Sequence, residues 1–383
     1  MAKAILALNV GSSSIKFAAY RFGDGELSLI CKGLLDQHVS DSHFTIRDAA
    51  GKTIDDEKPD LDNGADLTLA LIERLQPLLE NDELAAVGHR IVHGGPRFFD
   101  PVIIKPDVLH ELDELTPLAP LHQLGSLAPV RSLLKARPAL FQVACFDTAF
   151  HRGLEPVYRR FPIPDIGNGI HRYGFHGLSF EHVASKVTAP GLRIVIAHLG
   201  SGSSICAVRD GRSINTTMSL TPLDGVMMGT RCGAVDPGLL LYLQKSMGFA
   251  VADVEDLLYH KSGLLGVSGV SADMRTLLSA HDPNSMLAVE QFCARAAEHV
   301  ATMATSLGGL DALVFTGGIG ENSPPIRERI CERLKWLGLE LSSSANRQGA
   351  KCISAPESRV SLQVIPTDEE AVIAEHTAKL MAD

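Results

Sequence analysis

Residues 6–19 read LALNVGSSSIKFAA, and this stretch decides the predicted fold. An apolar strand from Ala4 to Val10 runs into a short glycine and serine turn, and a second strand follows from Ser14 to Tyr20. Two strands joined by so short a turn are expected to form a hairpin. Alternation along the second strand places Ser14 and Lys16 on its polar face, beside the free amides of the turn.

A second stretch, residues 194–208 with the sequence IVIAHLGSGSSICAV, repeats this pattern of strand, glycine and serine turn, and strand. A pattern that recurs once in each half of a chain predicts two similar α/β domains that face a shared cleft. A chance likeness between two short turns is the alternative.

The remaining segments alternate between short apolar runs and helical periodicity. Strands are predicted at residues 85–92, 141–146, 213–216, 312–316 and 362–365, and helices at residues 66–79, 285–307, 326–337 and 369–381. Asp236 is expected to cap one further helix and Ser271 another, and residues 317–322 are predicted to be a loop. The alternation of strands and helices is typical of the α/β class.

Composition limits the function classes that need to be considered. The 383 residues carry a formal net charge of −10, which argues against nucleic acid or an anionic membrane as a general partner. No apolar run is long enough to cross a bilayer, and the first residues lack the features of a signal peptide. The seven cysteines form no CxxC pair, so we expect free thiols and a cytoplasmic location.

Several common catalytic motifs are incomplete in this sequence. It contains no complete GxxxxGK[ST], GxGxxG, HExxH or GxSxG pattern. This argues against P-loop enzymes, Rossmann dehydrogenases, zinc proteases of the HExxH type and the common serine hydrolases.

Glycine clusters follow three of the predicted strands. They begin at Gly11, Gly200 and Gly317. Glycine lets the backbone approach a ligand closely, and free backbone amides bind phosphate oxygens. One such loop would be an ordinary turn, but three of them, each after a strand, favour a nucleotide that lies across the loop ends.

A few charged or titratable side chains stand beside these loops or at strand ends. Arg90 precedes Gly94-Gly95, Arg231 lies between glycines, and Asp147 ends a buried strand. Arginine binds carboxylate or phosphate through two parallel hydrogen bonds. For each arginine a structural ion pair is the alternative, and for His151 and His176 the alternative is a buried structural histidine.

These residues belong to a set of motifs that resembles the acetate kinase family of short-chain carboxylate kinases. The motifs run in family order, namely LNVGSSSIKF at 8–17, GHRIVHGG at 88–95, PLAPLH at 117–122, FDTAFH at 146–151, RYGFHG at 172–177, AHLG at 197–200, DGVMMGTR at 224–231, FTGGIGEN at 315–322 and IPTDEE at 365–370. Together they cover nearly the whole chain.

The resemblance implies the fold of the sugar kinase, Hsp70 and actin superfamily, in which two duplicated ribonuclease-H-like domains surround an ATP cleft. It places the carboxylate site in a domain of residues 1–148 with about 370–383, and the nucleotide in residues 149–369. It further implies a homodimer that transfers the γ-phosphoryl group of ATP reversibly to acetate, giving acetyl phosphate and ADP. Mg²⁺ is the implied metal, with Mn²⁺ as a substitute, and propionate or butyrate is the alternative substrate.

The resemblance also implies roles, position by position. The implied catalytic group is Asp147, His176, Arg231 and Arg90, and the implied substrate site is Arg90 with the apolar residues Val92, Leu121, Phe175 and Pro222. The implied ATP site consists of Ser12, Ser14, Lys16, His198, Leu199, Gly200, Ser201, Gly202, Asp273, Met274, Arg275, Gly318, Ile319, Gly320, Glu321 and Asn322. Asn9 and Glu369 match the metal positions.

Some positions depart from the family pattern. Gln123 and Ser201 each stand where asparagine is usual, Asp368 stands where asparagine is common, and Ala234 replaces a frequent aspartate. None of these changes removes a charged catalytic residue. A non-kinase, ATP-driven binding protein of the same superfold is the alternative from another class, although it would have no use for Arg90 and an alkyl pocket.

Overall fold

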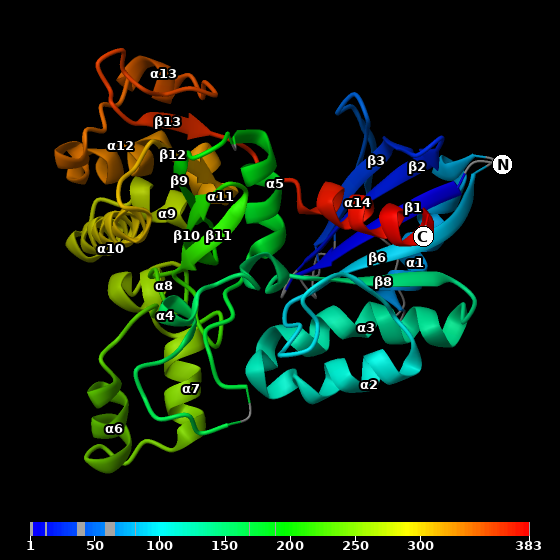
Figure 1. Ribbon diagram of the computed structural model, residues 1–383, viewed down its shortest axis with the longest axis horizontal. Coiled ribbons are helices and arrows are strands. Elements are labelled where there is room, and N and C mark those ends of the chain that lie inside the picture. Colours follow the sequence, from blue (N-terminus) through cyan, green and yellow to red (C-terminus); the bar gives the residue numbers. More distant parts are fainter. Residues whose placement is uncertain are drawn as a thin grey trace. The chain divides into compact units, whose positions relative to one another are not determined.

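The computed structural model describes residues 3–11, 14–36, 43–57, 66–80, 82–167, 169–187 and 189–382. The chain divides into two compact units. Unit 1 contains Met1–Ala149 and Asp368–Asp383, and unit 2 contains Phe150–Thr367. Each unit is built on its own β-sheet with helices on both faces (Figure 1).

The sheet of unit 1 has the strand order β5-β4-β3-β2-β1-β6-β8-β7. Its strands are β1 (Lys3–Val10), β2 (Ser14–Gly23), β3 (Glu26–Asp36), β4 (His43–Asp48), β5 (Thr53–Glu57), β6 (Glu83–Ile91), β7 (Val102–Ile103) and β8 (Phe141–Phe146). The predicted hairpin is confirmed, since β1 pairs antiparallel with β2 from Lys3↔Phe22 to Val10↔Ile15. Strands β1, β6 and β8 run parallel to one another.

Helices cover both faces of this sheet. The unit contains α1 (Leu67–Leu75), α2 (Pro106–Glu114), α3 (Pro120–Ala136) and α14 (Glu369–Ala382). On one face, Leu71, Ile72 and Leu75 of α1 pack with Leu6 and Leu8 of β1. On the other face, α14 lies against β1 and β6.

Glycine at position 88 permits the close approach of α14 to the sheet. A Cβ atom added there would lie 2.3 Å from the Thr377 hydroxyl and 2.5 Å from a methyl group of Ile373. No side chain fits in that space, so the last helix of the chain is seated directly on β6.

The sheet of unit 2 has the order β11-β10-β9-β12-β13. Its strands are β9 (Arg193–Leu199), β10 (Ser203–Arg209), β11 (Arg212–Thr216), β12 (Ala312–Thr316) and β13 (Ser361–Val364). Pairing is antiparallel across β9, β10 and β11 and parallel across β9, β12 and β13. The segment β3-β2-β1-β6-β8 of unit 1 has the same order and directions, so the predicted duplicated α/β fold is confirmed.

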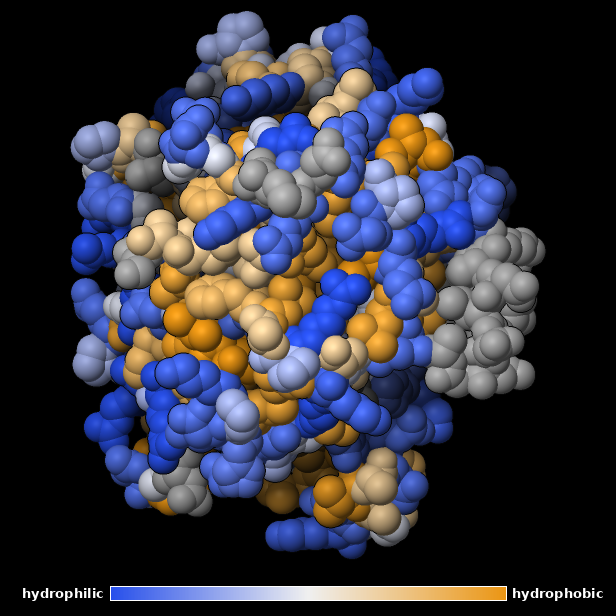
Figure 2. Space-filling view, turned by 90° about the vertical axis from the view of Figure 1, so that its right-hand side faces the viewer, coloured by the Kyte–Doolittle hydropathy of each residue, from blue (hydrophilic) through white to orange (hydrophobic). Residues whose placement is uncertain are grey.

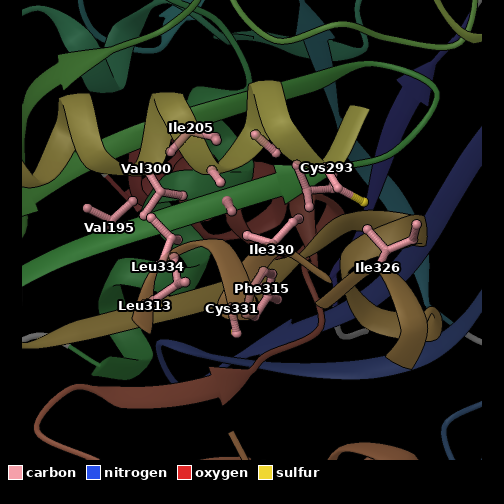
Figure 3. Close-up of a cluster of buried hydrophobic side chains, with 14 of the residues drawn as sticks. Val195, Ile205, Cys293, Val300, Leu313, Phe315, Ile326, Ile330, Cys331 and Leu334 are labelled. Carbon is pink, nitrogen blue, oxygen red and sulfur yellow. The ribbon is translucent and has the colours of Figure 1, made fainter. Parts of the chain in front are cut away.

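Strand alternation in β9 sends side chains to two different cores. Val195 joins a large cluster with α10 (Pro283–Leu307) and α12 (Pro324–Arg333), in which Phe315, Val300 and Ile330 point toward one another (Figure 3). Ile194 joins a second cluster on the opposite face, with Phe180 of α5 (Gly177–Val187).

Unit 2 contains several further helices. They are α4 (Pro156–Arg159), α6 (Pro237–Lys245), α7 (Val251–His260), α8 (Gly263–Ser268), α9 (Met274–Ser279), α11 (Gly317–Asn322) and α13 (Ser343–Arg347). Asp236 caps α6 as predicted. The predicted Ser271 cap is wrong, because the Asp273 side chain accepts the first free amides of α9, and the Ser271 hydroxyl accepts the Asp273 amide instead.

The prediction of a loop at residues 317–322 is also wrong, because these residues form helix α11. A run so rich in glycine has little helix propensity of its own. Side-chain contacts stabilise it: the carboxylate of Glu321, within the helix, accepts the Gly317 amide, and the buried guanidinium of Arg327, from α12, donates to the carbonyls of Gly320 and Glu321. The helix is thus held at both of its ends.

Among the described residues, no helix is long and apolar enough to cross a bilayer. On the face shown in Figure 2, apolar residues gather across the centre and hydrophilic residues surround them.

One buried histidine in each unit makes stability depend on pH. Burial lowers the pKa of both His89 and His151 from 6.5 to about 4. Between these values the unfolded chain binds protons that the folded chain does not, so acidification from pH 6.5 to 4 should lower the free energy of unfolding. Each histidine should contribute roughly 3 kcal/mol to this loss.

Urea unfolding near pH 7 and near pH 4.5 measures this effect. The variant His151→Asn should lose the share of the pH dependence that His151 contributes. A midpoint that does not change between the two pH values would contradict the expectation.

Candidate active site

Polar side chains gather at the carboxyl ends of the parallel strands of unit 1. Asn9 lies near the end of β1, Arg90 near the end of β6, and Asp147 directly after β8. Because these strands are neighbours and run in the same direction, their ends meet at one edge of the sheet. The first turn of α14 adds Glu369 and Glu370 at the same edge.

Arg90 is the centre of this cluster, which we call the unit 1 cluster. Its Nε atom lies 3.0 Å from Asp147 Oδ1, its Nη2 atom lies 2.5 Å from Asp147 Oδ2, and its Nη1 atom lies 3.2 Å from Asn9 Oδ1. Burial acts to lower the pKa of Arg90, but the charges of Asp147 and Glu369 outweigh it and raise the pKa above its ordinary value. The guanidinium is therefore a fixed positive charge with a set orientation.

The residues at the expected metal positions are in direct contact. The Asn9 amide donates to Glu369 Oε2 at 2.7 Å and to Glu370 Oε1 at 2.9 Å. Desolvation, and then the charge of Glu369, raises the pKa of Glu370. Two neighbouring, partly desolvated carboxylates beside an amide favour a hard cation, so these residues fit Mg²⁺.

No group of three or more His, Cys, Asp or Glu side chains in the described part of the chain could hold a metal by itself. Mg²⁺ commonly takes only one or two carboxylates from a protein and completes its shell with water and substrate phosphates. The small donor set in unit 1 is compatible with that preference.

Unit 2 has a cluster of its own, which we call the unit 2 cluster, formed by residues at the start of α5, at the end of β9 and at the start of β10. His176 precedes α5 with φ = 58°, a backbone conformation that is uncommon outside glycine. Its Nδ1 atom lies 2.8 Å from the Ser204 hydroxyl, and its ring stacks on His198 with 4.4 Å between the centroids. The His198 Nδ1 atom lies 2.8 Å from the Ser179 hydroxyl.

Arg231 and His176 both point toward the glycine loop after β9. A Cβ atom added at Gly202 would lie 2.6 Å from Arg231 Nη2 and 3.3 Å from His176 Nε2. The Arg231 Nη1 atom donates to the Pro222 carbonyl at 2.8 Å, which fixes the guanidinium. A guanidinium, an imidazole and a bare backbone loop therefore converge in unit 2, as anion binding requires.

Three glycine-containing segments of unit 2, at residues 200–202, at Gly229 and at Gly317, also adjoin one another. The Gly229 amide donates to the Ser201 carbonyl at 3.1 Å. A Cβ atom at Gly317, where φ is +77°, would lie 2.8 Å from the Leu199 carbonyl oxygen. The parallel pairing of β9 with β12 brings together the segments that follow these two strands, which begin at Gly200 and Gly317.

Several expected nucleotide-site residues make contacts inside unit 2. Met274 is buried, the Asp273 carboxylate caps α9 and pairs with Arg275 at 2.9 Å, and the Asn322 amide donates to the Gly318 carbonyl. The Glu321 Oε1 atom accepts hydrogen bonds from the Gly317 and Thr367 amides. Ile319 packs against the large core.

The other expected residues are divided between the units. Ser14, Lys16, Val92 and Leu121 belong to unit 1, and Phe175 and Pro222 belong to unit 2. Val92 and Phe175 are buried, and Lys16 is exposed. Ser12 lies outside the described residues, and the side chain of Leu121 is likewise not described.

Some functional candidates were missed from the sequence. Ser204 and Ser179 orient the two stacked histidines, and Glu370 shares Asn9 with Glu369. His151, considered as a candidate, is a buried histidine whose ring nitrogens face the Ser213 hydroxyl and the Phe175 carbonyl. These contacts fit the alternative that His151 is a buried structural histidine.

Comparison with known proteins decides the family. The model of the Acetokinase family matches residues 4–375. This chain belongs to the acetokinase family. The predicted resemblance is therefore confirmed.

Individual relatives agree with this assignment. The acetate kinase of Rhodopseudomonas palustris strain TIE-1 is 46% identical over 394 residues, covering 99% of each chain. The crystal structure of Porphyromonas gingivalis acetate kinase has a TM-score of 0.84 at 35% identity and covers 99% of this chain and 100% of its own. A propionate kinase from Francisella tularensis has a TM-score of 0.88 at 36% identity and covers 98% of both chains. The prediction of an ATP-dependent carboxylate kinase is therefore confirmed.

Proposed function

We propose that this chain is an acetate kinase that transfers the γ-phosphoryl group of ATP directly to acetate. A carboxylate oxygen forms a bond to the γ-phosphorus while the bond from that phosphorus to the β,γ-bridging oxygen breaks, and ADP leaves with the electron pair. The observation that carries the proposal is the convergence of Arg231 and His176 on the bare loop at Gly202. Such donors stabilise the charge on a phosphoryl group during transfer.

The reaction needs no general base. A simple carboxylic acid has a pKa near ~4.5, similar to that of a side-chain carboxyl, so acetate is already ionised at neutral pH. We therefore assign Asp147 to the orientation of Arg90, from which its carboxylate accepts hydrogen bonds. Arg90 in turn binds and partly neutralises the acetate carboxylate.

In this proposal the remaining residues bind the nucleotide and its metal. Asn9 and Glu369, with Glu370 beside them, would hold Mg²⁺, which would supply positive charge to neutralise the outer phosphates. We assign Ser12, Ser14 and Lys16, and residues 198–202, to binding of the phosphates. Asp273 to Arg275 and Gly318 to Asn322 bind the adenosine. We assign Val92 and Leu121 of unit 1, and Phe175 and Pro222 of unit 2, to binding of the methyl group of acetate.

Trapping of the product tests the proposal. Hydroxylamine converts an acyl phosphate into a hydroxamate, which can be measured by its colour with iron(III). We expect hydroxamate from ATP, Mg²⁺ and acetate, in step with ADP formation. ADP and phosphate without hydroxamate would indicate a hydrolase or an ATP-driven binding protein instead.

Propionate is the second candidate substrate, because the similar Francisella structure is that of a propionate kinase. One methylene group in an apolar pocket changes selectivity by only about 1–3 kcal/mol. The same assay with acetate, propionate and butyrate in parallel ranks them by kcat/KM.

We also propose that the protein acts in the cytoplasm as a homodimer. Each of four apolar residues on α6, in the turn after it and at the start of α7 is more than half exposed, namely Leu241, Tyr242, Met247 and Val251. An apolar surface of this kind on one helical arm fits a second copy of the same chain.

Sedimentation velocity should then give twice the mass of one chain. The double variant Leu241→Glu and Tyr242→Glu should sediment as a monomer, because it places charges in the apolar contact. Trp336→Glu changes an exposed aromatic residue elsewhere in unit 2 and is the matched control, which should remain dimeric. A dimer that persists in the double variant would place the contact elsewhere.

A further inference from the structure

Gln123 lies in the first turn of α3 and is completely buried. Both polar ends of its side chain are bonded to backbone groups of other segments. Its Oε1 atom accepts the His93 amide at 3.1 Å, and its Nε2 atom donates to the His93 carbonyl at 3.1 Å and to the Leu112 carbonyl at 3.2 Å. A single side chain thus joins α2, α3 and the segment after β6.

Residues 91–95, which contain His93, also form hydrogen bonds with the two residues that follow β8. The Gly94 amide donates to the Thr148 hydroxyl at 3.1 Å, and the Asp147 amide donates to the Ile91 carbonyl at 3.1 Å. Within the segment, the Gly95 amide donates to His93 Nδ1 at 2.8 Å. Gln123 and Thr148 therefore hold this backbone from two sides.

The segment continues directly from residues to which the proposed function assigns the substrate. Arg90 precedes it, and Val92 lies within it, immediately before the residue that Gln123 binds. Leu121 lies in the same turn of α3 as Gln123. Gln123 thus links the backbone next to Val92 to the turn of α3 that contains Leu121.

We propose that Gln123 is a positioning residue, which fixes segment 91–95 and through it Arg90 and Val92 for the carboxylate substrate. It touches neither substrate nor nucleotide. The inference rests on the proposed function, because it assigns a consequence for binding of the acid. Displacements of about 1 Å in a substrate-positioning group are enough to impair catalysis by about 10²-fold.

The variant Gln123→Leu tests the inference, because leucine has a similar volume and makes none of the three hydrogen bonds. We expect the KM for acetate to rise on the order of tenfold. The KM for ATP should stay within about twofold, because the residues assigned to adenosine and to the second phosphate loop lie in the other unit. Thr148→Val should raise the KM for acetate selectively as well, since it releases Gly94.

Ser126→Ala is the matched control. Ser126 is also buried on α3, but its hydroxyl donates only to the Gln123 carbonyl of the same helix, so both KM values should stay unchanged. If Gln123→Leu does not fold, Gln123→Met replaces it, since methionine keeps the length of the side chain and makes none of the three hydrogen bonds, and its KM for acetate should still rise selectively.

Two results would overturn the inference: an unchanged KM for acetate in the folded variant, or an equal rise in both KM values. The unsubstituted protein, assayed in parallel, separates this failure from that of the proposed function. If it forms no acyl phosphate, the proposed function is wrong, whereas normal turnover with an unaffected Gln123 variant rejects only the positioning role.

Discussion

Arg231→Ala is expected to lower kcat by about 10³-fold or more while the variant still binds ATP. The Arg231 guanidinium points at the loop around Gly202 and is held by the Pro222 carbonyl, so it is oriented before any substrate binds. Charge on the oxygens of the transferring phosphoryl group develops most strongly in the transition state, and a preorganised cation stabilises that state more than the bound substrate. The substitution of Arg231 should therefore lower kcat.

The hydroxamate assay at saturating ATP and acetate measures the loss, and calorimetric titration with ATP checks that binding remains. Arg231→Lys keeps the charge but lacks the planar fork, so it should recover only part of the rate. Arg295→Ala removes an exposed arginine of the same unit and should turn over normally. Near-normal turnover of Arg231→Ala would remove this residue from the catalytic group.

Arg90→Ala is expected to raise the KM for acetate by about 10²-fold or more. Truncation of one partner in a buried, hydrogen-bonded charge pair costs about 2–5 kcal/mol, and here the loss includes the cation proposed to bind the carboxylate. Asp147 is almost completely buried and loses its nearest positive charge, so the variant should also unfold at a lower temperature.

Initial rates over a range of acetate concentrations, at saturating ATP, measure this effect. Arg97→Ala removes an exposed arginine of the same unit that pairs with Glu111, and its KM should match that of the unsubstituted protein. An unchanged KM for acetate in a folded Arg90→Ala variant would rule out Arg90 as the carboxylate-binding residue.

The fold could be predicted from local patterns because its core strands are short and strongly apolar. The strand predicted at residues 141–146 is β8, and the strand predicted at residues 312–316 is β12. The two glycine and serine hairpins also pointed correctly to the repeated strand order. By contrast, α11 was missed because its stability comes from Arg327 and Glu321 rather than from the propensity of its own residues.

The candidate site was predictable only as far as its charged residues stand in recognisable motifs. Arg90, Asp147 and Asn9 were singled out from the sequence, but their mutual contacts depend on the parallel alignment of β1, β6 and β8. Ser204 and Gln123 were missed as partners because each is an uncharged residue whose role depends on a bond to a residue 28 or 30 positions away. No local pattern encodes such a pairing.

The position of α14 has a consequence for the order in which the chain is assembled during translation. This helix covers one face of the unit 1 sheet and brings Glu369 to Asn9, yet the ribosome makes it only after all of unit 2. Unit 2 is one continuous segment and can complete its core first, whereas the sheet of unit 1, although synthesised earlier, stays uncovered on that face until the end. The nascent chain should thus gain Glu369, one of the two residues proposed to bind the metal, only after unit 2 is complete, so that a prematurely terminated chain would lack it.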